Sequence, residues 1–326
     1  MVEYSVIIPN FNGEKWLKEC LSSIYESNKE IKDYFEVIIV DNASSDKSLD
    51  IVSQFFPDVL VVALENNFGF STACNMGVKK SKGKYLVFVN SDTKMNSNTL
   101  SLLSDEIVSR DLDAIAALEV PYASSKNSSE AQVVTTIDII GFPVYRFQDR
   151  SHNNFYLSAV CLLLLKETYL EVGGLDNNFF MYFEDIDFFW RMLLFEKSFD
   201  YSDTVAIMHA AHGSTSSNRF DSKRFLWRNE NLLKMLLKNY RLRNLIWVIP
   251  LYALSCTIEI AILVLIGKTS TSSTYFIETR NVIRDRKIIF ESRQIVQAKR
   301  RVSDLSILKR MYKGSGKLLS LKRQLL

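Results

Sequence analysis

The sequence predicts an α/β fold, and three observations in its first 120 residues support this prediction. Short β-branched runs recur at residues 5–10, 35–40, 59–64 and 85–90. These runs are continuously apolar, as expected of parallel strands that are covered on both faces. Helix-like segments lie between the runs, at residues 14–26, 46–56 and 71–81. Regular alternation of strand and helix is typical of a doubly wound sheet.

The composition fits a globular protein of 326 residues, 47% of them hydrophobic and 24% charged, with ample length for a buried core. The net charge of +3 is too weak to favour nucleic acid as a partner. The cysteines, Cys20, Cys74, Cys161 and Cys256, form no C-x-x-C pair, which favours reduced thiols in the cytosol over disulfides or a zinc site. A strand begins at once at the N-terminus, so no signal peptide is expected.

Polar residues follow each of the predicted strands. They are Pro9-Asn10, Asp41-Asn42, Glu65-Asn66-Asn67 and Asn90-Ser91-Asp92. In open parallel sheets the ligand crevice lies beyond the carboxyl ends of the strands. Asn, Asp and Ser also form ordinary turns, which explains any single strand end equally well. The set as a whole favours a ligand site at this edge of the sheet.

The loop after the first strand limits the kind of nucleotide site. It reads NFNGEKW, and with Gly13 as its one glycine it lacks the G-x-G-x-x-G pattern of a dinucleotide site. A Walker loop is absent from the sequence, as is the Gly-rich, Arg- and Lys-bearing first loop expected of a nucleotidyltransferase. A metal ion is then the simplest way to neutralise the phosphates of a bound nucleotide.

An ordered set of motifs between about residues 3 and 215 resembles the family 2 glycosyltransferases, which have the GT-A fold. The motifs read SVIIPNFNGEKWLKECLSSI, VIIVDNASSDKS, NFGFSTACNMGVKKSKGKYLVFVNSDT and GGLDNNFFMYFEDIDFFWRM. Within the family, the chain is most similar to the rhamnosyltransferase-like branch that builds cell-surface glycans. The resemblance implies a GT-A type, Rossmann-like mixed sheet flanked by helices.

The resemblance also implies which residues contact the nucleotide-sugar. Asp41 matches the aspartate that receives the base or ribose, and Pro9 and Asn10 would line the same pocket. The segment that packs beneath the nucleotide is matched by Asn67, Gly69, Phe70 and Asn75. Gly174, next to Gly173, would allow close backbone approach to the donor sugar.

Asn90-Ser91-Asp92 occupies the place of the family's D-x-D metal motif, with Asn90 in place of the first aspartate. Asp92 is then the one strong carboxylate ligand for Mg²⁺ or Mn²⁺, hard cations that prefer oxygen ligands and the phosphates of the donor. We expect the lost carboxylate to weaken metal binding in the absence of nucleotide. His209, in HAAHGS, matches the late histidine that completes the metal site in some members.

Carboxylates lie among apolar residues in MYFEDIDFFW, residues 181–190. Displacing a nucleoside diphosphate from a sugar needs a base for the acceptor hydroxyl, and apolar neighbours raise a carboxylate's pKa toward that task. The family places this base at Asp185, and Glu184 would hold the acceptor or orient the loop. An acidic first helical turn explains one or two carboxylates without any function. Asp187 and Arg191, at i and i+4, fit a local ion pair.

Aromatic residues surround these acids. They are Phe179, Phe180, Tyr182, Phe183, Phe188, Phe189 and Trp190. We expect them to form the wall of a sugar and acceptor cleft, although several must belong to the core.

An apolar stretch at residues 244–267 is long enough to span a bilayer and contains Pro250 and one acid, Glu259. Both flanks are basic, and the positive-inside rule keeps both in the cytoplasm. A helix in the membrane interface, or a re-entrant pair broken near Pro250, satisfies this rule. The strongly basic residues 276–326 would hold an anionic membrane surface. The alternative is a soluble helical subdomain that packs on the catalytic core or on a second copy.

Together these features predict a membrane-associated, inverting, metal-dependent glycosyltransferase at the cytoplasmic face of the cell membrane. Its donor would be a nucleotide-sugar and its acceptor a lipid-linked or growing glycan. The predicted catalytic domain spans residues 1–225, with a nucleotide-binding half at 1–120 and an acceptor half at 121–225, and residues 226–326 form the helical membrane-associated region. The alternatives are a sugar nucleotidyltransferase and a non-catalytic nucleotide-sugar or glycan binding protein. A homodimer is compatible with all three.

Overall fold

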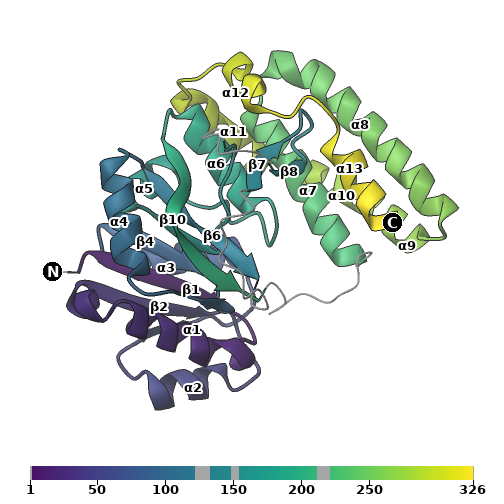
Figure 1. Ribbon diagram of the computed structural model, residues 1–326. Helices are drawn as coiled ribbons and strands as arrows, with labels where there is room; N and C mark the ends of the chain where they lie inside the picture. The colour runs from purple at the N-terminus through teal and green to yellow at the C-terminus, as the bar shows by residue number, and fades with distance from the viewer. Residues whose placement is uncertain (1, 122–132, 148–153, 211–220, 326) are drawn as a thin grey trace. The chain divides into compact units, whose positions relative to one another are not determined.

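A computed structural model describes residues 2–121, 133–147, 154–210 and 221–325 of the chain (Figure 1). The chain divides into two compact units that interleave along the sequence. The sheet unit comprises Met1–Gln132, Leu157–Phe180 and Lys197–Ser216, and the helical unit comprises Val133–Tyr156, Met181–Glu196 and Ser217–Leu326. The domain boundaries expected at residues 120 and 225 stay a prediction.

The sheet unit contains a mixed eight-stranded sheet in the order β3-β2-β1-β4-β9-β6-β10-β5. Its first half is β1 (Tyr4–Asn10), β2 (Phe35–Asp41), β3 (Leu60–Ala63) and β4 (Tyr85–Val89). These strands pair in parallel, and they confirm the strands predicted from the β-branched runs. The prediction of burial on both faces is wrong for β3, which ends the sheet and leaves Leu60 and Val61 exposed.

The second half of the sheet is built from β9 (Cys161–Leu165), β6 (Ala114–Pro121), β10 (Phe199–His209) and β5 (Thr93–Lys94). β9 runs antiparallel to both β4 and β6, β6 and β10 are parallel, and β5 is antiparallel to β10. β9 therefore lies between β4 and β6, two strands that both come earlier in the chain. The mixed sheet confirms the predicted fold class.

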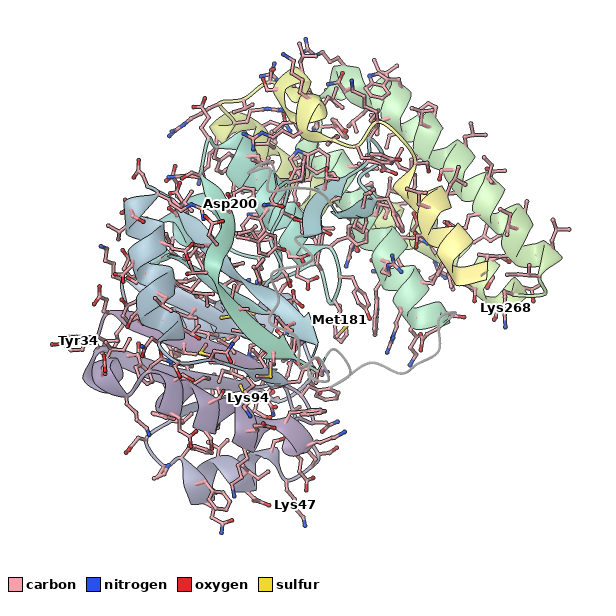
Figure 2. All side chains as sticks on the ribbon, in the orientation of Figure 1. Tyr34, Lys47, Lys94, Met181, Asp200 and Lys268 are labelled. Atoms are coloured by element: carbon pink, nitrogen blue, oxygen red, sulfur yellow. The ribbon has the colours of Figure 1, made fainter. Side chains whose placement is uncertain are left out.

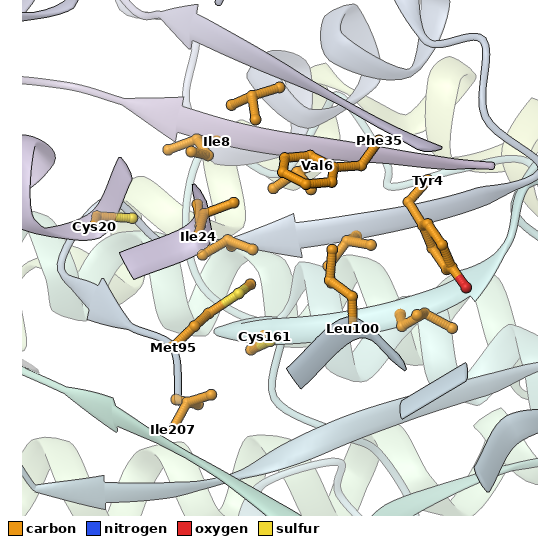
Figure 3. Close-up of a cluster of buried hydrophobic side chains, with 14 of the residues drawn as sticks. Tyr4, Val6, Ile8, Cys20, Ile24, Phe35, Met95, Leu100, Cys161 and Ile207 are labelled. Carbon is orange, nitrogen blue, oxygen red and sulfur yellow. The ribbon is translucent and has the colours of Figure 1, made fainter. Parts of the chain in front are cut away.

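Helices cover the strands of the sheet unit. They are α1 (Glu14–Ser27), α2 (Ser48–Phe55), α3 (Phe70–Lys80), α4 (Thr99–Ser109) and α5 (Lys166–Val172), with a 3₁₀ segment, η1 (Lys29–Tyr34). Figure 3 shows part of the core beneath them, where Val6 and Ile8 of β1 meet Ile24 of α1 and Leu100 of α4, all of them fully buried. Continuous burial of apolar side chains is the main force that stabilises such a sheet.

The helical unit holds the hairpin of β7 (Val133–Ile137) and β8 (Pro143–Phe147), which pair antiparallel. Its helices are α6 (Glu184–Leu194), α7 (Ser222–Asn239), α8 (Leu242–Leu265), α9 (Thr269–Ser272), α10 (Thr274–Arg284), α11 (Arg286–Lys299), α12 (Asp304–Arg310) and α13 (Gly316–Leu325). The Asp138 carboxylate accepts hydrogen bonds from the amides of Phe142, at 2.9 Å, and Gly316, at 2.7 Å. The β7–β8 turn is thus joined to the start of α13.

α8 is the one helix in the described part of the chain that is long and apolar enough to cross a membrane. It runs without interruption through Pro250. The break near Pro250 that a re-entrant pair requires is therefore absent, and that prediction is wrong.

Candidate active site

The carboxyl ends of β1 and β2 bring two predicted nucleotide-binding residues together. Asn10 pairs with Asp41 in the parallel register, directly after Pro9. The Asn10 side chain donates from Nδ2 to Asp41 Oδ1 at 2.9 Å, and Ser44 donates to the same carboxylate from its hydroxyl, at 2.6 Å, and from its amide, at 3.0 Å. Both Asn10 and Asp41 are buried. The sheet edge therefore holds an ordered carboxylate rather than a mobile loop.

One buried acceptor at this edge has no donor. Asn10 Oδ1 is buried and accepts no hydrogen bond from the described residues. A Cβ atom added at Gly13 would lie 2.1 Å from Asn10 Oδ1 and 3.4 Å from Ser91 Oγ, so a glycine at position 13 makes room for the Asn10 side chain. Because a buried polar atom without a partner is costly, the arrangement fits a ligand that donates a hydrogen bond here.

The other predicted nucleotide-binding residues gather around the start of α3. Gly69 has a φ of +86°, and a Cβ there would lie 2.1 Å from the carbonyl oxygen of Phe180. Phe70 donates its amide to the same carbonyl at 2.9 Å, and Asn67 Oδ1 accepts from the Gly69 amide at 3.0 Å. The segment that starts α3 is thus fixed against Phe180, and only glycine fits at position 69.

Asn75 of α3 is bonded to the segment that follows α5. Its side chain donates to the carbonyl of Leu175 at 2.7 Å and accepts from the hydroxyl of Tyr169 at 2.6 Å. A Cβ at Gly174, which has a φ of +68°, would lie 2.7 Å from Asn75 Oδ1. The close approach at Gly174 is therefore to the chain's own Asn75, whereas the sequence predicted an approach to the donor sugar. Contact with that sugar stays a prediction.

The two predicted metal ligands lie side by side. Asp92 follows Asn90 and Ser91 in the turn between β4 and β5, and His209 ends β10. His209 Nε2 lies 3.2 Å from Asp92 Oδ1, and its Nδ1 lies 3.0 Å from Glu119 Oε2 on β6. Glu119 was not among the residues predicted from the sequence. The sequence motifs do not predict that Glu119 lies beside His209, because β6 pairs with β10 only in the folded sheet.

Both carboxylates act on the charge of this histidine. Burial alone lowers the pKa of His209, but the hydrogen bonds and negative charges of Asp92 and Glu119 outweigh burial and raise that pKa to about 9. Among the described residues, no group of three or more His, Cys, Asp and Glu is arranged as a metal site. The pair of Asp92 and His209 fits a metal that takes its other ligands from a diphosphate, provided that the proton on Nε2 leaves.

In the helical unit, Glu184 and Asp185 begin α6. Glu184 Oε2 is buried and has no hydrogen-bond partner among the described residues. Burial first, and the charge of Asp185 second, raise the pKa of Glu184 to about 8. Asp185 Oδ1 accepts from the amide of Ile186 at 2.7 Å. The two acids thus differ in environment, and the raised pKa keeps Glu184 largely protonated near neutral pH.

The backbone before these acids is strained. Tyr182 and Phe183 have φ values of +73° and +68°, in the left-handed region that bulky residues avoid. Asn231 of α7 donates to the carbonyls of Met181, at 3.0 Å, and Tyr182, at 2.8 Å. Strain that is held in place by the surrounding structure is common at functional sites. No pattern in the sequence predicts this turn.

The carboxylate of Asp187 is fully bonded to other side chains of the helical unit. It is fully buried and accepts hydrogen bonds from Arg191 Nε at 2.9 Å, Lys238 Nζ at 2.8 Å and Asn239 Nδ2 at 3.0 Å. The predicted ion pair of Asp187 and Arg191 is confirmed, and the two further partners fix α6 on α7.

The aromatic wall predicted around the acids is mostly core. Its buried members are Phe179, Phe183, Phe188, Phe189 and Trp190. Phe180 and Tyr182 are partly exposed. The expectation that the set lines a cleft is therefore wrong for most of it, because apolar residues of α6 serve to pack the helix.

Comparison with known proteins identifies the family of the chain. The family model for "Glycosyl transferase family 2" matches residues 5–173. The chain therefore belongs to glycosyl transferase family 2. The matched range ends before Glu184 and Asp185.

Two similar proteins are glycosyltransferases by their names. GlyG of Streptococcus pneumoniae, a glycosyltransferase, is 33% identical over 114 residues, which are 34% of this chain and 37% of GlyG. TarS of Staphylococcus aureus, a poly(ribitol-phosphate) β-N-acetylglucosaminyltransferase, is 36% identical over 103 residues, which are 31% of this chain and 18% of TarS. These matches span less than half of either relative.

Two solved structures resemble the fold. A crystal structure of TarS residues 1–349 gives a TM-score of 0.53 at 18% identity, covering 73% of this chain and 66% of that one. A mannosyltransferase of Pyrobaculum calidifontis, in complex with GDP-Man and Mn²⁺, gives a TM-score of 0.53 at 15% identity, covering 91% of this chain and 86% of that one. At such identity the likeness concerns the fold, and it confirms the predicted GT-A type sheet with flanking helices.

Proposed function

We propose that this protein is an inverting glycosyltransferase that moves a sugar from a nucleoside-diphosphate donor to a glycan or lipid-linked acceptor. The observation that carries the proposal is the pairing of Asp92 with His209 at the sheet edge, in a chain that belongs to glycosyl transferase family 2. The proposed donor site continues along the same unit through Pro9, Asn10, Asp41, Asn67, Gly69, Phe70, Asn75, Asn90, Ser91 and Gly174.

We assign Asp92 and His209 as the ligands of Mg²⁺ or Mn²⁺. When bound, the metal supplies positive charge to the diphosphate that leaves the sugar. Asn90 cannot act as a second carboxylate, so the remaining oxygen ligands would come from the diphosphate and from water. Glu119 holds the ring of His209 from its other nitrogen, as outer-shell carboxylates do in metal sites.

We assign Asp185 as the general base. In this step its carboxylate takes the proton of the acceptor hydroxyl while the acceptor oxygen bonds to the anomeric carbon. The bond from that carbon to the phosphate oxygen breaks, and the nucleoside diphosphate leaves with the electron pair. One displacement inverts the anomeric centre. The protonated Glu184, whose Oε2 lacks a partner among the described residues, can donate a hydrogen bond to the acceptor.

The name of TarS, a poly(ribitol-phosphate) β-N-acetylglucosaminyltransferase, supports a polymer as the acceptor class. The rhamnosyltransferase branch stays a prediction, since neither relative described above carries that name.

We also propose that residues 226–326 hold the protein at the cytoplasmic face of the cell membrane, which would bring it to lipid-linked acceptors. α8 supports this by its length and composition. A homodimer stays a prediction.

A panel of nucleotide-sugars, incubated with the full-length protein and Mg²⁺ or Mn²⁺, tests the proposal. Release of nucleoside diphosphate from one donor, faster with acceptor present, is the expected result. Release of pyrophosphate would instead indicate a sugar nucleotidyltransferase. Binding without any release would indicate a nucleotide-sugar binding protein, the alternative that Asn90 in the metal motif favours.

A further inference from the structure

α8 has two faces that differ along its whole length. Its buried residues recur every three or four positions and form one stripe. They are Val248, Tyr252, Cys256, Glu259 and Leu263. This spacing places them on one side of the helix. The helix is therefore covered by protein on one side from its first quarter to its last.

Polar groups of the buried stripe are satisfied by α10 and α13. Lys317 Nζ lies 2.8 Å from Glu259 Oε2 and 3.3 Å from Cys256 Sγ. The hydroxyl of Tyr275 donates to the same Glu259, and that of Tyr252 donates to Glu278. α13 lies beside α8, as Figure 1 also shows. The one charge within residues 244–267 is thus neutralised inside the helical unit.

The outward side of α8 is apolar and exposed. Ile246 is 76%, Leu254 58% and Leu265 84% exposed, so the exposure extends from one end of the helix to the other. Further exposed apolar side chains on α8 are Leu242, Trp247, Leu251, Ile258 and Val264. An exposed apolar surface of this extent marks an interaction site rather than ordinary protein surface.

The charge of the region indicates what covers this face. Residues 226–326 contain 20 Lys and Arg against 6 Asp and Glu, although the whole chain has 40 against 37. Exposed cations lie at both ends of α8. They are Arg241 and Arg243 at its start and Lys268 just after its end, which Figure 2 labels. An apolar face bordered by excess positive charge is complementary to an anionic lipid surface, and a second copy of so basic a region would be repelled.

The position of α10 distinguishes two orientations of α8, one that spans the bilayer and one that lies in the plane of the interface. Tyr275 meets Glu259 and Glu278 meets Tyr252, so α10 runs antiparallel to α8. If α8 spanned the bilayer, the exposed Arg280 and Arg284 of α10 would follow it into the acyl layer. If α8 lies in the interface plane, the protein-covered side faces the cytoplasm and neither arginine has to enter the acyl layer.

We propose that α8 lies in the plane of the cytoplasmic interface, with its exposed face in the acyl layer and its Glu259 stripe on α10 and α13. The inference rests on the membrane association proposed above and specifies its geometry. Anionic phospholipid is the occupant of the exposed face.

The depth of spin labels on the full-length protein tests the orientation. Ile246→Cys, Leu254→Cys and Leu265→Cys each place one label on the exposed face, because the native cysteines are buried and react poorly. The labelled proteins are mixed with vesicles of phosphatidylcholine and phosphatidylglycerol. Accessibility to oxygen and to a water-soluble nickel chelate then gives the depth of each label. Val108→Cys is the matched control, because the side chain of Val108 is exposed on α4 of the sheet unit.

Similar shallow depths at all three α8 positions, with Val108→Cys in water, are the expected result. Shallow labels at both ends with a deep label at position 254 would overturn the inference in favour of a spanning helix, and membrane association would stand. Failure of the protein to float with the vesicles would overturn both. Since the readout is depth, a lack of sugar transfer would contradict only the proposed enzyme activity.

Discussion

Two neighbouring carboxylates at the start of α6 have different surroundings. Glu184 has a buried, unpartnered Oε2 within the described structure, and burial raises its pKa to about 8. Asp185 accepts the amide of Ile186. An acid that is neutral at pH 7 beside a carboxylate is the usual division of labour in acid–base catalysis. This supports Asp185 as the base and Glu184 as a donor to the acceptor.

Asp185→Asn should abolish most transfer, because the amide cannot take the acceptor proton. A fall in kcat of roughly 100-fold or more is expected from loss of a general base, with nucleotide affinity unchanged. Steady-state kinetics and calorimetric nucleotide binding measure the two effects. Asp58→Asn, at an exposed position of the sheet unit, is the matched control and should turn over normally. Near-normal turnover of Asp185→Asn would disprove the assignment.

Asp92→Asn should abolish metal-dependent nucleotide binding, since it removes the one carboxylate of the motif. His209→Gln should weaken that binding by about tenfold, because Asp92 and the diphosphate remain. Calorimetric titration of each variant with a nucleoside diphosphate, once with Mn²⁺ and once with chelator, separates the metal-dependent part of the affinity from the metal-independent part. Unchanged affinity in both variants would mean that metal is bound elsewhere or not at all.

The charge of His209 should make the metal-free protein less stable at high pH. Its pKa is raised from 6.5 to about 9, so the folded state holds this proton more tightly than the unfolded state. The resulting stabilisation is complete below pH 6.5 and is lost as pH rises through about 9. Solvent screening of the partly exposed ring reduces it to on the order of 1–2 kcal/mol. Urea unfolding in chelator at pH 6 and 9.5 measures the loss. His209→Gln should show a smaller difference, and an equal one would refute the prediction.

At the scale of elements, the turn before α6 depends on another helix. Tyr182 and Phe183 hold left-handed backbone conformations, at a cost of about 1–3 kcal/mol each. The buried Asn231 of α7 binds the carbonyls of this turn. α7 thus fixes the direction in which the chain enters the helix that carries Asp185.

Asn231→Ala should release this turn. Two carbonyls lose their donor, at about 1–3 kcal/mol for a buried unsatisfied group, and Asp185 loses its fixed position. The expected result is a lower kcat with nucleotide affinity unchanged and lower stability. Asn281→Ala, which removes a hydrogen bond to Glu230 of α7 and leaves the Asn231 bonds to the turn intact, is the control for a simple loss of stability. If both variants lost kcat equally, the turn would have no special role.

Prediction from sequence succeeded where the signal is local. β1, β2 and β4 follow from their β-branched runs, and α8 from its apolar length. Exposure of β3 was missed because an edge strand is defined by its neighbours. The antiparallel insertion of β9 pairs residues 85–89 with 161–165, which no local pattern encodes. The same limit hid Glu119 and Asn231, whose roles depend on contacts made after folding.

At the scale of the whole molecule, charge is divided along the chain. Residues 226–326 contain 20 of the 40 Lys and Arg but only 6 of the 37 Asp and Glu. The net charge of +3 conceals this asymmetry. An anionic membrane attracts the basic residues 226–326 and repels the acidic remainder of the chain. The protein is therefore expected to bind the membrane through residues 226–326.

Replacing exposed cations of the helical unit should therefore weaken membrane binding in a salt-dependent way. Arg280→Gln with Lys287→Gln removes two exposed charges of the helical unit. At about 1 kcal/mol per charge near an anionic surface, partitioning into phosphatidylglycerol vesicles should fall about 30-fold at low salt. The difference should shrink in 1 M salt, where the Debye length is about 3 Å. Binding that remains in 1 M salt reports burial of the α8 face, which salt does not screen.

The matched control for this last prediction is Lys79→Gln with Lys80→Gln, two exposed cations of the sheet unit. It carries the same change in net charge, so an equal loss of binding would mean that total charge, and not the basic helical unit, brings the protein to the membrane. Vesicles of phosphatidylcholine alone provide the second comparison. On these vesicles the wild type and both variants should bind alike and without salt dependence, because the apolar face of α8 is the same in all three.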